Sequence, residues 1–307
     1  MAIVKYPTAP PELSVVVPCL GHAEELRACL TALSAQDLRS VYEVVVVDSA
    51  SDDQVAAAVS TFPIARLVRS EARLAPGPAR NLGVSIAVAD LLVFTDADCR
   101  PEPGFLGAAR ATLNQGARLA TGPIVDAPGG FIAACDNLLQ FVDFSAGRPA
   151  GPAQYAPGCN LAIRKADFLA AGAFPDGGAE DLRLSIAVAE RWPGRLMFNP
   201  EMRVRHLGRP TLGALIDHHR SFGLERARHR VHLKHWQLRL GRCRIMMLPI
   251  AAKRLAYLGS RTLRWNPRRL AFVLGSSFVL MVGLVAWARG FRAGLILDGQ
   301  DIKMVDD

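Results

Sequence analysis

Several patterns that would assign the chain to a well-defined class are missing from the sequence. The six cysteines form no C-x-x-C pair and no Cys/His spacing typical of a zinc site, which disfavours both a structural metal and a disulfide framework. A reducing compartment is therefore the natural interpretation. The first ten residues lack the apolar run and cleavage site of a secretory signal, so we expect the amino-terminal domain to fold in the cytoplasm.

Phosphate-binding glycine loops are also absent. The turn after the first apolar run reads PCLGHAEE and contains neither G-x-G-x-x-G nor G-x-x-x-x-G-K-[ST]. A Rossmann dehydrogenase and a P-loop NTPase are therefore disfavoured.

What the first half of the chain does contain is an alternation of short apolar runs and helical stretches. The apolar runs are continuous, and such runs are typical of strands covered on both faces. This alternation predicts an α/β domain with a mostly parallel sheet. The expected strands cover 13–17, 43–47, 64–68 and 91–95, and the expected helices 23–35 and 77–89.

The positive charge is concentrated in the second half. The formal net charge is +8, which suits an anionic partner such as nucleic acid, a phosphorylated substrate or a membrane surface. Residues 206–244 are rich in Arg, Lys and His and contain two acidic residues, Asp217 and Glu225. No interleaved aromatic platform accompanies these basic groups, so nucleic acid is the weakest of the three partners.

An apolar segment follows this basic stretch. Residues 270–288 are uncharged, and a helix of that length spans about 28 Å, close to the hydrocarbon thickness of a bilayer. We therefore expect a transmembrane helix rather than a buried core helix. The segment 245–259 is interrupted by Lys253 and Arg254. It is expected to lie in the membrane interface, the alternative being the first half of a hairpin.

Acidic side chains follow two of the predicted strands. Asp96 and Asp98 in TDAD are two residues apart and can point to the same side, where their oxygens suit a hard divalent cation. The carboxyl ends of strands are where open α/β sheets bind ligands, although D-x-D also occurs by chance in turns. Asp48 ends another strand and can either contact a nucleoside or form an Asx turn or helix cap.

Five segments in this order resemble glycosyltransferase family 2, the inverting nucleotide-sugar enzymes with the GT-A fold. The resemblance covers about residues 12–235 and is closest to the membrane-anchored bacterial type. The segments are LSVVVP with AEELRACLTALSAQ, VVVVDSASDD, GPARNLGVSIAVADLLVFTDADCRPEP, GCNLAIRKADFLAAGAF with AEDLRL, and VRHLGRPTLGALIDHHRSFG.

The resemblance implies a role for each matching residue. Asp48 would contact the nucleotide base, Arg80 would lie near the nucleotide, and Asp96 and Asp98 would hold Mg²⁺ or Mn²⁺ at the diphosphate. Of the E-D pair, Asp181 would be the general base, and Glu180 is the second choice, with a possible role in orienting the acceptor. Asp181 can also be a first-turn acid of the helix that AEDLRLSIAVAERW predicts, and the two roles can coexist.

His206 in VRHLG is a candidate third metal ligand, since some related enzymes use a histidine at a comparable place, and the alternative is a structural histidine. No carboxylate or cysteine joins the later histidines in sequence, so we assign them to a cationic stretch that docks on an anionic leaflet. These are His218, His219, His229, His232 and His235.

The sequence also departs from the family pattern. The usual asparagine after the first strand is replaced near Gly21 and His22, and Arg183 stands where a second acid often follows the E-D pair. No Q-x-x-R-W follows downstream, which argues against a processive polysaccharide synthase and favours a single transfer per encounter.

The resulting prediction is a cytoplasmic GT-A domain over 12–205, a basic helical collar over 206–244, and a membrane-associated segment over 245–292. The expected reaction moves one sugar from a nucleotide-sugar donor to a membrane-associated glycan or lipid acceptor at the cytoplasmic membrane, in the assembly of cell-envelope polysaccharide. Two rivals stay open: a nucleotidyltransferase, and a noncatalytic membrane scaffold that keeps the glycosyltransferase fold.

Overall fold

The computed structural model describes residues 10–51, 53–229 and 241–303. They divide into two compact units. The first, here the sheet unit, contains the described residues up to 125 together with 149–206, and the second, the helical unit, contains 126–148 and the described residues from 207 onward. The uninterrupted domain expected over 12–205 differs from this division, because residues 126–148 pack with the carboxyl-terminal helices.

An eight-stranded sheet forms the framework of the sheet unit, in the order β3-β2-β1-β4-β9-β6-β10-β8. Its strands are β1 (Leu13–Cys19), β2 (Tyr42–Ser49), β3 (Ala65–Ser70), β4 (Leu91–Phe94), β6 (Leu119–Thr121), β8 (Gly151–Pro152), β9 (Leu161–Arg164) and β10 (Leu196–Phe198). Strands β1 to β4 pair in parallel, as do β6 and β10, whereas β9 runs antiparallel to both β4 and β6. The prediction of a mostly parallel α/β sheet is confirmed.

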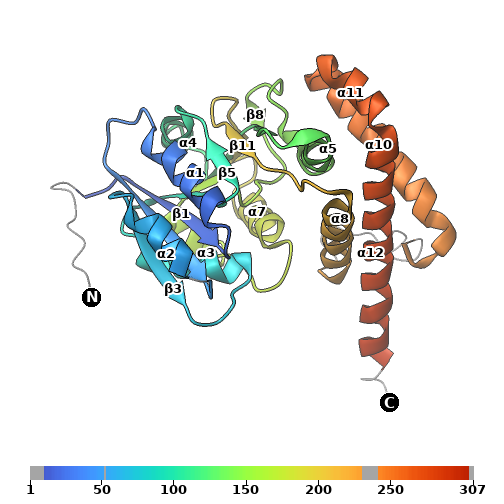
Figure 1. Cartoon of the computed structure of the whole chain (residues 1–307), viewed down its shortest axis with the longest axis horizontal. Helices are drawn as coiled ribbons and strands as arrows, with labels where there is room; N and C mark the ends of the chain where they lie inside the picture. The colour runs from blue at the N-terminus through green and yellow to red at the C-terminus, as the bar shows by residue number, and fades with distance from the viewer. Residues whose placement is uncertain (1–9, 52, 230–240, 304–307) are drawn as a thin grey trace. The chain divides into compact units, whose positions relative to one another are not determined.

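The valine-rich strands are buried on both faces because helices of the sheet unit cover them (Figure 1). The helices are α1 (Ala23–Ser34), α2 (Asp53–Ser60), α3 (Pro76–Ile86), α4 (Phe105–Asn114), α6 (Lys165–Ala170) and α7 (Glu180–Arg191). One core cluster joins Val16 and Phe94 of the sheet to Leu184 and Val188 of α7. Helix α3 lies so close to the sheet that a Cβ at Gly83 would collide with Val16.

A second, three-stranded sheet contains β5 (Cys99–Pro101), β11 (Val204–His206) and β7 (Ile124–Asp126). Strands β5 and β11 are antiparallel, and their register places His206 opposite Cys99. This pairing brings a histidine from late in the sequence beside the D-x-D segment.

The helical unit is built from α5 (Gly130–Phe141), α8 (Leu212–Arg228), α10 (Met247–Trp265), α11 (Leu270–Gly275) and α12 (Ser277–Lys303), with short 3₁₀ turns at 142–144, 244–246 and 267–269. A core cluster joins Cys135 and Leu139 of α5 to Leu215, Leu258 and Leu284. Burial of this apolar face of α5 is the physical reason that residues 126–148 belong to the helical unit.

Helices α8 and α12 run side by side (Figure 1). Glycines let the two backbones approach, since a Cβ at Gly290 would collide with the carbonyl of Arg220, and one at Gly223 with the carbonyl of Trp287. The guanidinium of Arg254 on α10 lies 4.0 Å from the ring centroid of Trp287, so this arginine makes a cation–π contact within the unit.

The helix expected over 270–288 is wrong in its boundaries. Helix α11 ends at Gly275 and α12 begins at Ser277. Ser276 lies between the two helices, and its hydroxyl donates to the carbonyl of Phe272. The segment Ser277–Ile296 is the one described helix long and apolar enough to cross a membrane, and half of that window is buried within the structure. Part of the basic collar, residues 230–240, lies outside the described residues.

Candidate active site

Arg80 connects the two parts of the chain that carry the predicted catalytic acids. Its Nη2 donates to Oδ1 of Asp96 at 2.7 Å, and its Nη1 donates to Oε1 of Glu180 at 2.8 Å. Arg80 is 3% exposed. Burial opposes its charge, but the two carboxylates outweigh that cost and raise the pKa of the guanidinium. The buried bridge therefore joins the D-x-D segment to the E-D pair 84 residues later in the chain, at Glu180.

Glycines make room for this bridge. A Cβ at Gly158 would lie 2.7 Å from the Arg80 guanidinium, and one at Gly77 would lie 3.1 Å from Cγ of Glu180. The structure thus brings together the ARNLG, D-x-D, GCNLAIR and AEDLRL segments that the sequence singled out.

Asp181 lies in the first turn of α7, next to Glu180. Its Oδ2 accepts the backbone N–H of Gly158 at 3.0 Å, and its Oδ1 accepts the N–H of Leu182 at 2.7 Å. Burial, together with the negative charge of Glu180, raises the pKa of the Asp181 carboxyl to about 6. A carboxylate with such a pKa is well matched to proton abstraction near neutral pH.

Asp98 and His206 face each other across the β5–β11 ladder. Their Oδ2 and Nε2 atoms are 3.7 Å apart, and with the sulfur of Cys99 they form a group of potential metal ligands within 4.8 Å of one another. Burial raises the pKa of the Cys99 thiol well above its usual range. The other two donors of this group are a carboxylate oxygen, which suits Mg²⁺ and Mn²⁺ alike, and an imidazole nitrogen, which suits Mn²⁺ better than Mg²⁺.

Asp96 differs from Asp98 in its surroundings. Its carboxylate accepts from Arg80, and it is not a member of the group formed by Asp98, Cys99 and His206. Asp96 is 30% exposed at its side chain and Asp98 26%, so both acids keep access to solvent. That Asp96 and Asp98 share one cation stays a prediction.

Asp48 ends β2 and is fully buried. Its Oδ2 lies 3.0 Å from Nε of Arg69, and its Oδ1 accepts the backbone N–H of Ser51 at 3.2 Å. The second contact is a local bond from the backbone to the carboxylate that reaches three residues along the chain, whereas the Asx turn considered from the sequence reaches two. Contact of Asp48 with a nucleoside stays a prediction, and each carboxylate oxygen retains a further lone pair for it.

Left-handed backbone at non-glycine residues accompanies three of these segments. His22, Ala50 and Ala179 have φ of 56°, 56° and 55°. They follow β1, follow Asp48, and precede Glu180, respectively. Such conformations cost free energy and cluster at functional sites, so the placement of His22 and Ala50 agrees with a site at the carboxyl ends of β1 and β2.

One cluster was missed by the sequence analysis. The expectation that no carboxylate joins the later histidines is wrong: Oδ1 of Asp136 lies 3.2 Å from Nδ1 of His218 and 3.0 Å from Nε2 of His219. Asp136 also accepts from Arg209 N–H and the Gln140 amide. Asp136 precedes these histidines by more than 80 residues, and nothing in the local pattern signals the contact. The cluster joins α5 to α8.

Comparison with known proteins shows what the sheet unit is similar to. The model of the family described as glycosyl transferase family 2 matches residues 14–134. This match covers the predicted strands and the D-x-D segment of the sheet unit, so this part of the chain is similar to a family 2 glycosyltransferase domain. Glycosyltransferase AglE of Haloferax volcanii is 28% identical over 173 residues, which cover 54% of this chain and 57% of AglE. The uncharacterised glycosyltransferase Rv0539 of Mycobacterium tuberculosis is 34% identical over 110 residues, 36% of this chain and 47% of Rv0539.

The chain thus spans about half the length of the curated relatives it matches. Among solved structures, the chain resembles mannosyltransferase PcManGT from Pyrobaculum calidifontis in complex with GDP-Man and Mn²⁺, with a TM-score of 0.60, 21% identity, and coverage of 96% of this chain and 87% of that one. S. aureus TarS 1–349 in complex with UDP-GlcNAc has a TM-score of 0.56 at 17% identity, covering 94% of this chain and 92% of TarS. These structures have the GT-A fold, as expected for this chain.

Proposed function

We propose that this glycosyltransferase moves one sugar from a nucleotide-sugar donor to a membrane-associated acceptor with inversion at the anomeric carbon. The observation that carries the proposal is the bridge of Arg80 between Asp96 and Glu180. It links the segment predicted to face the donor diphosphate with the pair predicted to face the acceptor hydroxyl. The neighbours crystallised with GDP-Man and UDP-GlcNAc support a nucleotide-sugar donor.

In this proposal Asp181 is the general base. Displacement at the anomeric carbon develops positive charge on the sugar and negative charge on the departing nucleoside diphosphate, while the acceptor hydroxyl loses its proton. The raised pKa of Asp181 equips it to accept that proton at neutral pH, and its two backbone N–H contacts hold the carboxylate in place. Glu180 is assigned to position Arg80 rather than to accept a proton.

Asp98 and His206 are the residues proposed to hold a divalent ion, with Asp96 as the further acid of the motif. When bound, Mn²⁺ or Mg²⁺ would supply Lewis-acid stabilisation of the diphosphate charge. The carboxylate and imidazole donors fit Mn²⁺, the ion named with PcManGT. Asp48 is proposed to contact the nucleoside, from the end of β2.

The membrane-associated acceptor is inferred from the helical unit. Large apolar side chains of this unit are open to solvent, namely Ile245, Leu248, Leu274 and Phe278 at 82%, 65%, 67% and 76% exposure. Exposed apolar groups at this density favour contact with a membrane. With the apolar helix Ser277–Ile296, they support attachment to a membrane. The cytoplasmic membrane, with the sheet unit in the cytoplasm, and lipid-linked sugars of envelope polysaccharide assembly as the acceptor class are the further parts of this proposal.

A donor screen tests the proposal. Purified full-length protein is mixed with a panel of nucleotide sugars with and without Mn²⁺, and thermal shift and product release are measured. We expect one donor to raise the apparent Tm in the presence of Mn²⁺. Asp98→Ala should abolish the part of this Tm increase that depends on Mn²⁺. Asp176→Ala, an exposed acid before α7, is the matched control.

The same screen separates the two rivals. Release of a nucleoside diphosphate supports glycosyl transfer, whereas release of pyrophosphate from a nucleoside triphosphate and a sugar phosphate identifies a nucleotidyltransferase. Donor binding without any turnover, in the presence of membrane extract as acceptor source, identifies a noncatalytic scaffold.

A further inference from the structure

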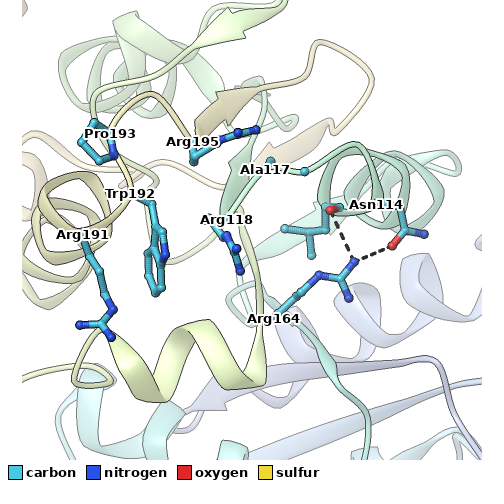
Figure 2. A pocket seen from close by; sticks show the side chains of 10 residues that line it. Asn114, Ala117, Arg118, Arg164, Arg191, Trp192, Pro193 and Arg195 are labelled. Carbon is cyan, nitrogen blue, oxygen red and sulfur yellow. Dashed lines mark hydrogen bonds between the residues drawn. The ribbon is translucent and has the colours of Figure 1, made fainter.

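A cavity of about 610 Å³ lies in the sheet unit, apart from the residues proposed for glycosyl transfer. Four arginines line it, Arg118, Arg164, Arg191 and Arg195, together with Trp192 (Figure 2). The remaining lining residues are Leu113, Asn114, Gly116, Ala117 and Pro193. None of them is acidic.

Sheet topology places this arginine cavity at the opposite edge of the sheet from the donor site. Arg118 directly precedes β6, Arg195 directly precedes β10, and Arg164 ends the antiparallel strand β9. All three therefore lie at the amino ends of the parallel strands. The acids of the proposed donor site follow the carboxyl ends of β2 and β4, at the other edge, where open α/β sheets bind their ligands. The cavity is thus a separate site.

The positive charge of the cavity is largely uncompensated. Nη1 of Arg118 pairs with Oδ1 of Asp167 at 2.8 Å. Arg164 donates to neutral acceptors, Oδ1 of Asn114 and the carbonyl of Leu113. Within the part of the chain that the structure describes, no carboxylate lies within ion-pair distance of Arg164, Arg191 or Arg195.

Trp192 orders two of these groups. The guanidinium carbons of Arg118 and Arg191 each lie 5.3 Å from a Trp192 ring centroid, and Figure 2 shows the two side chains on opposite sides of the indole. A cation–π contact restricts a guanidinium without using its N–H groups. Nη1 of Arg118 is engaged by Asp167, so the other N–H groups of Arg118 and those of Arg191 are the donors held in position before a ligand arrives, which lowers the entropic cost of binding.

We propose that the arginine cavity binds a ligand that carries two or more phosphate charges. Guanidinium forks match phosphate oxygens in bidentate geometry. The volume lies within the range of small-molecule sites, about 300–1,000 Å³, and leaves room for more than a single phosphate. Two sources share this chemistry: a soluble polyphosphate such as a nucleotide, and the headgroup of an anionic phospholipid.

The test is calorimetric binding to the full-length protein in detergent, in EDTA, so that a divalent ion near Asp98 does not contribute. The probes are inorganic pyrophosphate and short-chain dihexanoylphosphatidic acid below its micelle concentration, a lipid whose phosphomonoester headgroup carries up to two negative charges. The variants are Arg195→Glu and Arg191→Glu, both exposed at the cavity, and Arg39→Glu as the control, an exposed arginine on the loop before β2. All three make the same change in net charge, and unfolding curves verify that each variant folds.

We expect pyrophosphate to bind the wild type and Arg39→Glu alike, and to bind Arg195→Glu and Arg191→Glu at least about tenfold more weakly, the cost of one charge-assisted hydrogen bond. A loss seen with the dihexanoylphosphatidic acid probe but not with pyrophosphate also supports the site and identifies a lipid headgroup as its source. Equal binding of both probes to all four proteins, or binding of neither probe to the wild type, overturns the proposal. Because no nucleotide sugar is used, the outcome is independent of the proposed glycosyl transfer.

Discussion

Arg80 holds the proposed active site together through the shape of its side chain. The guanidinium presents separate N–H groups to Asp96 and Glu180, and the glycine at 158 leaves room for it. An ammonium is a single point charge and cannot serve two carboxylates with the same fixed geometry. The residue therefore acts through orientation as much as through charge.

Replacing Arg80 by lysine should lower kcat/KM by at least about tenfold, since one of two charge-assisted hydrogen bonds is lost while the charge is kept. Steady-state kinetics with the donor found in the screen measure this. Arg39→Lys is the control and should leave kcat/KM unchanged. Full activity of Arg80→Lys would mean that the bridge is not needed for the reaction.

The role proposed for Asp181 predicts how kcat/KM depends on pH. A general base works only when ionised, and the pKa of Asp181 is raised to about 6 by burial and by Glu180, so kcat/KM should fall as the pH drops through about 6. Glu180→Gln removes the neighbouring negative charge, which lowers the pKa of Asp181 and should move this acid limb to lower pH. A pH–rate profile of the two proteins tests it, and an acid limb that stays in place in Glu180→Gln would assign the titration to another group.

At the scale of elements, the contact between α8 and α12 depends on glycine. A methyl group at Gly290 would collide with the Arg220 carbonyl, whereas a methyl group at Gly259 of α10 meets nothing within 4 Å. Gly290→Ala should therefore lower the free energy of unfolding by about 1–3 kcal/mol. Gly259→Ala should leave it unchanged or raise it by up to about 1 kcal/mol, because alanine favours the helix. Thermal unfolding of both variants in detergent measures this, and equal Tm values would show that the two backbones are not in close contact.

The link between α5 and α8 through Asp136 is a second property of these elements. Burial disfavours the charge of Asp136, but hydrogen bonds from His218 and His219 outweigh that cost and hold the pKa of the carboxyl below its usual range. A carboxyl whose pKa is lowered in the folded protein stabilises the fold at pH values above its pKa in the unfolded chain, which is near 4. This stabilisation is lost as the pH falls from there toward the lowered pKa.

Asp136→Ala leaves several buried donors without an acceptor and should lower the free energy of unfolding at pH 7 by about 3 kcal/mol. The difference from the wild type should shrink only as the pH falls below about 4, so unfolding curves at pH 7 and at pH 2.5 are compared. A pH-independent difference would point to lost packing instead of the charge.

For the whole molecule, the sequence predicted the sheet better than the division into units. Continuous valine runs identify strands buried on both faces, and Asp48, Asp96 and Asp98 follow such runs, so their position at one edge of the sheet could be foreseen. The grouping of α5 with the last helices could not, because an amphipathic helix does not specify its partner. Asp136 beside His218 and His219, and the arginine cavity, depend on the same long-range packing.

The break between α11 and α12 was only weakly indicated by the sequence. Gly275 and Ser276 interrupt the apolar run, but composition alone does not separate a tolerated glycine from a helix end.

Membrane attachment is a property of the whole molecule and makes its own prediction. Leu274 and Phe278 are exposed on the helical unit, and Leu169 is exposed at 59% on the sheet unit. A Leu274→Arg, Phe278→Arg double variant should shift a large part of the expressed protein from the membrane to the soluble fraction, since each buried arginine costs about 2.5–3.5 kcal/mol in a bilayer. Leu169→Arg should not. Equal partitioning of all three proteins, measured by sedimentation and blotting, would argue for a helical unit that packs only against itself.

The most direct test of the account compares Asp181→Asn with Asp176→Asn. The amide keeps the shape of the carboxylate but cannot accept a proton from the acceptor, a step typically worth 10² to 10⁴-fold in rate. With the donor from the screen, Mn²⁺ and a membrane acceptor, we predict that Asp181→Asn binds the donor normally and releases nucleoside diphosphate at least about a hundredfold more slowly than Asp176→Asn. Equal rates for the two variants would contradict the assignment of Asp181 as the base and, with it, the proposed mechanism.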